Sequence, residues 1–511
     1  MRVFPFLKDD GSRKESYIVN FRGLNYGEGY VDGEFAQTTN LSSEKYPCIA
    51  PRRERVKVGQ FTAPTTLHAK EGLLVVDGTK VFYDGKEVGT VTAGRKQMAT
   101  VGNYVCIFPD KVYYNTAEGT FQSMEASYAA SGLVFTDHTI TTTGADWPFR
   151  VGDAVEIKGC TAVDENGRTN NKTPIVRGVD GKVLTFYENT LVPGTEEGTV
   201  TLKRNVPDLD FICESNYRLW GTQGNTILGS KYGDPLNFFC YDGIASDSYS
   251  VDVGSDGKFT GCIPYSAHIC FFKEHTLHKL YGTKPANFQL VNSAVYGVQE
   301  GCERTMVVVN EELLYKGVHG VYAYAGGIPD LVSECFGAKH FSDAAAASDG
   351  EKYYISMKHG DKWEMYAYDI LKDIWLREDE THAVDLTAHD GCVYYLADDG
   401  GLYRIDRAAG RDSVEWSAEF CPFTETMDER KGYSRFTMRV DMAAGAWLGV
   451  DVRTEHDERW KTVWTGHNER ARTFSVPIIP TRCDSVRVRV YGKGDCTIKA
   501  FVREFTVMSD V

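Results

Sequence analysis

Hydrophobic and polar residues follow one pattern at seven places along the chain. Each copy has a short aromatic or β-branched run, a turn of Gly, Asp, Asn or Lys, and a second run that is often rich in Tyr. The copies begin near Leu73, Tyr104, Tyr217, Ile269, Leu313, Tyr353 and Val393. Successive copies lie 31, 113, 52, 44, 40 and 40 residues apart. A period of this length, with two strongly apolar strands in each copy, is typical of four-stranded propeller blades. The pattern therefore predicts an all-β chain with a six- or seven-bladed β-propeller.

The alternative interpretation is one β-sandwich, or a pair of them, with hairpins at similar intervals. Sandwich strands have no reason to recur as paired hairpins about 40 residues apart. The turns also fall at matching places within each copy, which favours the propeller.

The long interval between the copies at Tyr104 and Tyr217 is explained if residues 127–204 are an insertion. Without this segment, the interval is that of an ordinary repeat. Within the insertion, residues 149–157 alternate between apolar and polar side chains, residues 159–172 form a polar loop, and residues 183–187 read as another strand. We expect an inserted small β-barrel, with the propeller formed by residues 61–126 and 205–410.

The two ends of the chain differ from the repeats. Residues 411–511 contain strictly alternating runs, which predict a C-terminal β-sandwich with one face of each strand buried. Residues 1–60 have little periodicity and are predicted to form an extended N-terminal arm. The basic cluster Arg52, Arg53 and Arg55 lies near the end of this arm.

Charge and composition narrow the function classes. The 511 residues include 56 basic and 71 acidic side chains, which gives a net charge of −15. Residues 411–511 are neutral overall, so the whole excess of acidic side chains lies before residue 411. A surface for nonspecific nucleic-acid binding would need clustered positive charge, so this class is disfavoured. The chain has no apolar run of membrane-spanning length, and its first residues do not resemble a signal peptide. The 13 scattered cysteines then indicate reduced core residues of a protein made in a cytosol.

Motifs that carry catalytic or metal chemistry are weak in this sequence. Each Gly-Lys pair lacks the following Ser or Thr of a nucleotide-binding loop, and neither HExxH nor GxSxG occurs. His275 and His278 would face opposite sides of a strand, and residues 252–257 lack the distal Glu of a calcium loop. These features predict ordinary strand and turn residues.

Two further sets of residues have both a purely structural and a functional interpretation. The acidic pairs Asp398–Asp399 and Glu311–Glu312 could serve a glycosidase, but adjacent acids on a strand point apart and turns are commonly acidic. Four tryptophans could form a platform for sugars, but Trp in a hairpin is more often a core residue; these are Trp220, Trp363, Trp375 and Trp464. We predict no catalytic, cofactor-binding or metal-binding residue, no cofactor, and a protein that is not an enzyme.

Three stretches resemble the β-propeller structural proteins of tailed bacteriophages, the group that includes packaged-DNA stabilisation and tail-nozzle proteins. The first stretch, Asp32 to Arg53, contains Asn-Leu-Ser followed by Pro and then Arg-Arg. In the second, Asn216 to Phe238, a polar turn joins two strands and the sequence Gly-Asp-Pro follows. The third stretch is Val486 to Phe501. Together they cover under a fifth of the chain. The insertion at 127–204 has no counterpart that we can place in the short-tailed proteins.

The resemblance implies a noncatalytic virion structural protein at the head-to-tail junction, nozzle or tail. It implies a homo-oligomeric ring of about six copies that contacts neighbouring tail or connector proteins and is assembled in the host bacterial cytoplasm. DNA would pass through an acidic lumen without specific binding, and no membrane would be involved. The alternative is a carbohydrate-binding or carbohydrate-cleaving propeller, such as a tail adhesin or depolymerase.

Overall fold

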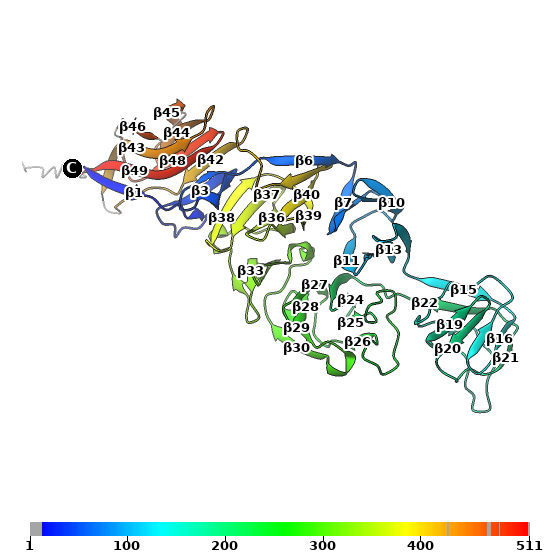
Figure 1. Ribbon diagram of the computed structural model, residues 1–511. Helices are drawn as coiled ribbons and strands as arrows, with labels where there is room; N and C mark the ends of the chain where they lie inside the picture. The colour runs from blue at the N-terminus through cyan, green and yellow to red at the C-terminus, as the bar shows by residue number, and fades with distance from the viewer. Residues whose placement is uncertain (1–12, 427–428, 468–471, 480, 509–511) are drawn as a thin grey trace, which may run out of the picture. The chain divides into compact units, whose positions relative to one another are not determined.

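The computed structural model describes residues 13–426, 429–467, 472–479 and 481–508. Within these residues, regular structure consists of β-strands and four single-turn 3-10 helices, which confirms the predicted all-β class. The described residues form two compact units, one within 62–303 and one within 1–61 together with 304–511. Figure 1 labels the strands of both units.

The unit of residues 62–303 contains four antiparallel sheets, each with four strands paired in chain order. The first two sheets are β7 (Pro64–Lys70), β8 (Gly72–Asp77), β9 (Lys80–Tyr83) and β10 (Lys86–Thr90), then β11 (Gln97–Val101), β12 (Tyr104–Phe108), β13 (Val112–Asn115) and β14 (Thr120–Ser123). The next two are β23 (Phe211–Ser215), β24 (Arg218–Gln223), β25 (Thr226–Gly229) and β26 (Tyr249–Asp252), then β27 (Phe259–Tyr265), β28 (His268–Lys273), β29 (Thr276–Tyr281) and β30 (Gln289–Ala294). This four-stranded meander is the form of a propeller blade.

The other unit contains three more sheets of the same form among its described residues. Two are continuous in sequence: β31 (Val307–Val309), β32 (Glu312–Gly317), β33 (Gly320–Tyr324) and β34 (Asp330–Leu331), then β35 (Ala344–Ser348), β36 (Lys352–His359), β37 (Lys362–Asp369) and β38 (Ile374–Asp379). The third consists of β39 (Ala383–His389), β40 (Cys392–Ala397) and β41 (Gly401–Ile405), completed by β6 (Arg55–Gln60). Its fourth strand therefore comes from the N-terminal segment, which is remote in sequence from the other three strands.

Each of the seven predicted hairpins forms the two middle strands of one of these sheets. Most of the middle strands are covered on both faces, and β28 and β33 are buried at every position. Burial on both faces gives continuous apolar runs, whereas the outer strand β10 is exposed or half-buried throughout. Between neighbouring sheets, Trp220 packs in a core shared by the third and fourth sheets.

The insertion forms a β-domain with its own core. One sheet contains β15 (Ala126–Ala130), β22 (Val200–Arg204) and β18 (Glu156–Lys158). The other contains β19 (Val176–Asp180), β20 (Val183–Phe186), β17 (Thr139–Thr141), β16 (Leu133–Phe135) and β21 (Gly194–Glu196). The predicted small barrel is thus seen as two sheets around one hydrophobic cluster, which includes Trp147, Phe149 and Leu184.

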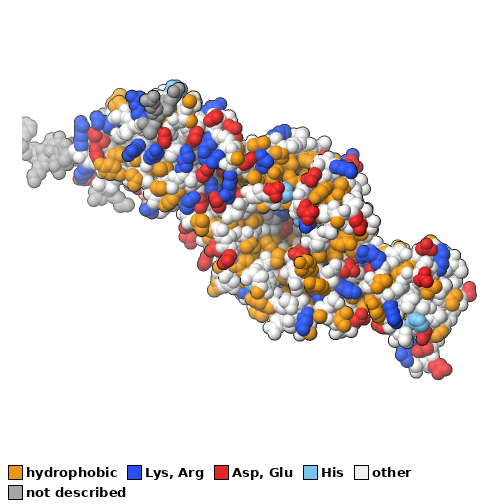
Figure 2. All heavy atoms as spheres, in the orientation of Figure 1, with side chains coloured by type: hydrophobic (Ala, Val, Ile, Leu, Met, Phe, Trp, Pro, Cys, Tyr) orange, Lys and Arg blue, Asp and Glu red, His pale blue; other side chains and the backbone are white. Residues whose placement is uncertain are grey.

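Two larger sheets pack face to face at the C-terminal end of the chain. One contains β1 (Lys14–Ile18), β49 (Cys496–Met508), β43 (Arg430–Met442), β46 (Arg472–Pro477) and β47 (Arg482–Cys483). The other contains β2 (Gly23–Leu24), β3 (Glu34–Thr39), β42 (Glu415–Phe420), β48 (Val486–Lys493), β44 (Trp447–Thr454) and β45 (Lys461–His467). Side chains alternate between buried and less buried along β48, as the sequence predicts, and basic and acidic side chains are interspersed on the face shown in Figure 2.

Residues 13–60 differ from the prediction of an extended arm over 1–60, of which residues 1–12 lie outside the described part of the chain. Among the described residues, β1 pairs with β49, β3 pairs with β42 and β6 pairs with β41, so this segment supplies strands to three sheets. Each strand brings few apolar side chains to the core, such as Ile18 and Phe35, which is why the sequence shows no periodicity there. The short strands β4 (Leu41–Ser42) and β5 (Ala50–Pro51) and the 3-10 turn η1 (Ser43–Lys45) connect β3 to β6.

Most of the cysteines are core residues, as the sequence predicts, whereas Cys48, Cys335 and Cys392 are half-buried. All 13 fall within the described residues, and ten are buried. Burial raises the pKa of the Cys106 and Cys270 thiols, so these groups stay protonated near neutral pH.

Candidate functional site

A set of paired charged side chains surrounds the arginine cluster of residues 52–55. The cluster is held in place from both ends, because Leu41–Ser42 pairs with Ala50–Pro51 on one side and β6 pairs with β41 on the other. The Ser42 hydroxyl accepts a hydrogen bond from the backbone of Glu44 and begins the η1 turn. The three arginines therefore project from a short, doubly anchored segment.

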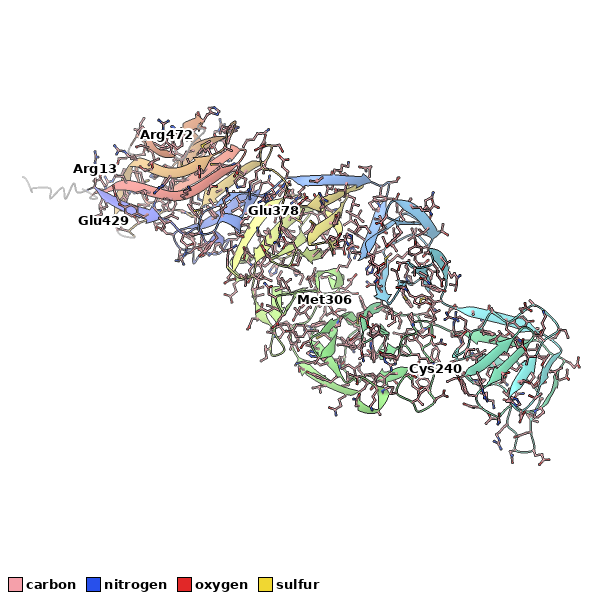
Figure 3. The ribbon with its side chains drawn as sticks, in the orientation of Figure 1. Arg13, Cys240, Met306, Glu378, Glu429 and Arg472 are labelled. Atoms are coloured by element: carbon pink, nitrogen blue, oxygen red, sulfur yellow. The ribbon has the colours of Figure 1, made fainter. Side chains whose placement is uncertain are left out.

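Arg55 and Arg52 form ion pairs with Glu378 and Asp379 at the end of β38. Arg55 lies 2.6 Å from Glu378 Oε2 and 3.0 Å from Asp379 Oδ2, and it also donates to the Thr381 hydroxyl at 2.7 Å. Arg52 lies 3.3 Å from the same Asp379 oxygen. Only 7% of the Arg55 side chain and 5% of the Glu378 side chain is exposed, so these charges are removed from water (Figure 3 labels Glu378). We call Arg52, Arg55, Glu378 and Asp379 the buried ion network.

A second pairing ties the same segment to the start of the sandwich. Arg53 binds the Glu44 carboxylate in a bidentate manner, at 2.5 and 3.2 Å, and donates to the Ala409 carbonyl at 2.9 Å. Arg411 also binds Glu44 and donates to the Pro51 carbonyl at 2.9 Å. Bidentate arginine–carboxylate pairs fix orientation as well as distance.

The charges of this region shift the pKa values of its carboxyl groups. Burial acts to raise the pKa of Asp379, but the positive charges of Arg55 and Arg52 outweigh it and lower that pKa below its usual 3.8. Burial also acts to raise the pKa of Glu44, but the interactions of its carboxylate with Arg53 and Arg411 outweigh this effect and lower the pKa. Both carboxylates are therefore ionised near neutral pH, as ion pairing requires.

Two cavities flank the buried ion network. The larger, about 540 Å³, is lined by six acidic residues, among them Asp379, Asp398 and Asp399, and by the rings of His382, Tyr395 and Tyr403. The smaller, about 300 Å³, is lined by six basic and five acidic side chains, among which Lys352 donates to the Ser42 hydroxyl. Charges of opposite sign thus largely compensate one another in the smaller cavity.

The acidic pair Asp398–Asp399 occupies the turn before β41, as its turn interpretation predicts. Asp399 accepts hydrogen bonds from the Gly401 backbone at 2.7 Å and the Tyr403 hydroxyl at 2.9 Å, and these bonds lower its pKa. Asp398 lies 3.6 Å from His382 Nδ1. A carboxyl with a lowered pKa is a poor proton donor near neutral pH, so neither Asp399 nor Asp379 suits the role of general acid.

The other residues weighed in the sequence are spread over the chain. His278 is buried on β29 and hydrogen-bonds to Ser255 at 2.8 Å, and burial lowers its pKa, whereas His275 precedes the strand. Glu311 lies in a turn at φ 68°, and Glu312 begins β32. The structure therefore does not bring either pair together as a site. Among the described residues, no group of three His, Cys, Asp or Glu side chains is arranged to hold a metal ion.

The tryptophans mostly follow the core interpretation. Trp220 and Trp375 are buried, and the indole of Trp375 donates to the Val332 carbonyl at 2.7 Å. Trp464 is partly buried against the sandwich core. Trp363 instead stacks on His382, with ring centroids 3.9 Å apart, and His382 lines the larger cavity.

The sequence marks the arginines as a cluster, but it does not mark their acidic partners. Glu378 and Asp379 belong to the run Arg-Glu-Asp-Glu at 377–380, which follows a strong apolar strand. A search for opposite-charge clusters would have marked this run. Its pairing with the arginine cluster has no local signal, because partners such as Arg55 and Glu378 are remote from each other in the sequence.

Comparisons with known proteins give no family. No protein-family model matches the chain, and no curated protein matches it. Among solved structures, the extracellular domain of a protein described as a one-component system from B. thetaiotaomicron aligns at 10% identity and TM-score 0.38, over 88% of this chain and 62% of that one. An exo-beta-1,3-galactanase from Phanerochaete chrysosporium aligns at 8% identity and TM-score 0.23, over 57% and 94%. Likenesses at this level carry no argument about function. Within the described residues, no helix is long and apolar enough to cross a membrane.

Proposed function

We propose that the protein is a noncatalytic structural subunit of a tailed-bacteriophage virion, which forms a ring of about six copies at the head-to-tail junction, nozzle or tail. The resemblance of three sequence stretches to such proteins motivates the proposal. One observation in the structure supports it: the N-terminal segment supplies strands to three sheets, and the buried ion network also fastens it to β38 of a fourth sheet.

This fastening suits a subunit that must keep its shape under mechanical stress. Pulling residues 13–60 away would break the ladders of β1, β3 and β6 and would also separate Arg55 from Glu378. Separated buried charges are costly, so the segment resists local opening. The first 410 residues carry the net charge of −15, and an acidic lumen would repel DNA and let it slide.

The mass of the purified full chain in solution tests the proposal. We expect light scattering to give a particle several times heavier than the 57.0 kDa chain, stable on dilution. A mass of one chain at every concentration, including high concentrations, would count against a self-assembling ring.

A second candidate function is carbohydrate cleavage, which the larger cavity favours because it combines six carboxylates with aromatic rings. Its test is release of reducing ends from host-type glycans. Turnover that Asp398→Asn abolishes would support this function, and it would contradict the noncatalytic proposal.

A further inference from the structure

The insertion is joined to the loop between β25 and β26 by a set of buried polar contacts. Asp153 forms an ion pair with Arg204 at 2.8 Å and accepts a hydrogen bond from Asn237 at 3.0 Å. Asn237 also accepts from the backbone of Ala154 at 3.1 Å. Because these groups are buried and their hydrogen bonds are made, the insertion and residues 230–248 hold one another in a fixed position.

The loop itself is held by a fully buried arginine. Arg218 donates to the carbonyls of Ser230 at 2.7 Å, Asp247 at 2.5 Å and Ala245 at 2.9 Å. Three charge-assisted bonds fix both ends of this connection, which contains no strand or helix. The side chains that the loop presents toward the insertion are therefore preorganised.

A cavity of about 230 Å³ lies at this junction, close to Cys240, which Figure 3 labels. The loop contributes the rings of Phe239 and Tyr241 and the carboxylate of Asp242, and the insertion and the segment that follows it contribute Glu156, Lys203 and Asn205. Tyr241 is 56% exposed although it is a large aromatic side chain. An exposed ring beside a cavity with polar walls is a feature of ligand sites.

The polar groups divide into a fixed set and a free set. Glu156 is held by Asn205 at 2.7 Å and by Lys158 at 2.8 Å. Asp242 and Lys203, in contrast, make no hydrogen bond with another side chain in the described part of the chain, and the positive charge of Lys203 helps to lower the pKa of Glu156. The cavity therefore offers a carboxylate acceptor and an ammonium donor next to an aromatic face.

We propose that this cavity binds one hexose unit of a neutral glycan. Sugars combine apolar C–H faces, which stack on aromatic rings, with hydroxyls that bind carboxylates, amides and ammonium groups. The lining holds three carboxylates against one ammonium, which disfavours acidic sugars, phosphates and other anions. The volume lies below the roughly 300 Å³ at which pockets for drug-sized ligands begin, so it suits a single ring.

The test is binding of neutral oligosaccharides of glucose and galactose to the purified full chain, first on a glycan array and then by calorimetry. We expect binding of at least one neutral glycan. Tyr241→Ala should weaken it about tenfold through loss of stacking and buried area, and Asp242→Asn should weaken it severalfold. Thr173→Trp, at a position on the cavity wall, should block it.

The matched control is Tyr217→Ala, which removes another exposed tyrosine near the sheet of β23–β26 without touching the cavity. Binding that persists in Tyr241→Ala, or that Tyr217→Ala abolishes instead, would overturn the assignment. So would the absence of binding to any neutral glycan, preference for sialylated glycans, or a calcium titration that saturates the site and excludes sugar. Ring assembly is measured separately, so a failure here leaves the structural proposal standing.

Discussion

Replacement of Arg55 by methionine should loosen the sheet of β39, β40, β41 and β6 at its N-terminal strand. The substitution removes the ion pairs with Glu378 and Asp379 and the hydrogen bond to Thr381, and it leaves a buried carboxylate with a weaker partner. Removal of one partner from a buried ion pair costs about 3–5 kcal/mol. Arg52 stays 3.7 Å from Glu378, so we expect the lower end, about 3 kcal/mol.

Hydrogen exchange followed by mass spectrometry measures this effect locally. A loss of about 3 kcal/mol should raise the exchange rate of the amides in β6 and β41 about a hundredfold. Glu378→Gln should produce a smaller change, and the double variant should cost less than the two single variants added together, because the charges interact directly.

Lys80→Met is the matched control, since Lys80 pairs with Glu87 at a similar distance of 2.7 Å, but both side chains are about half exposed. Such a pair contributes at most about 1 kcal/mol. The reasoning is refuted if Arg55→Met leaves exchange in β6 within a factor of three of the wild type, or if its effect and that of Glu378→Gln are additive.

The remaining predictions concern other parts of the chain. Acid should weaken the buried ion network, because the pKa of Asp379 is lowered in the folded chain and the stability that this carboxylate contributes at neutral pH is lost as the pH falls below about 4. Between pH 5 and pH 3, hydrogen exchange in β6 should therefore rise, and it should rise less steeply in Arg55→Met than in the wild type. Arg218→Met leaves three carbonyl groups without their hydrogen-bond donor, so the free energy of local opening of residues 230–248 should fall by about 3 kcal/mol and their hydrogen exchange should rise accordingly. Arg218→Lys should recover part of the lost protection. Trp220→Ala should cost about 3–5 kcal/mol in urea unfolding. Deletion of residues 1–60 should yield an unfolded or insoluble chain, by circular dichroism and solubility, because it removes β1, β3 and β6; a soluble, folded deletion product would show that these strands are dispensable.

The inner hairpins could be predicted because their strands are buried on both faces. Runs such as the Ile-Cys-Phe-Phe of β28 carry enough apolar side chains to mark a strand without knowledge of its neighbours. Outer strands such as β10 and β30 carry no such signal, since they are mostly exposed and polar. Their existence follows from the blade architecture.

The path of residues 13–60 could not be predicted for a different reason. The sequence of β6 contains charged and small residues, and its partner β41 lies far away in the sequence. Pairing at such separation depends on the sheet already being formed. The ion pair of Arg55 and Glu378 could not be predicted for the same reason: the sequence shows that both side chains are charged, but it does not show that they contact each other.

The cavity beside Tyr241 also depends on tertiary structure. Its walls come from two segments, the insertion and the loop after β25, and neither has a motif that marks a site. The sequence located both segments, one as an insertion and one as a Gly-Asp-Pro loop. Their juxtaposition follows from the contacts of Asp153 and Asn237.

Electron microscopy of the purified full-length protein tests the central claim most directly. If the chain is a ring-forming virion subunit, class averages should show closed rings of about six copies around a central channel, and the rings should persist at low protein concentration. Single chains without rotational symmetry at every concentration would contradict the claim.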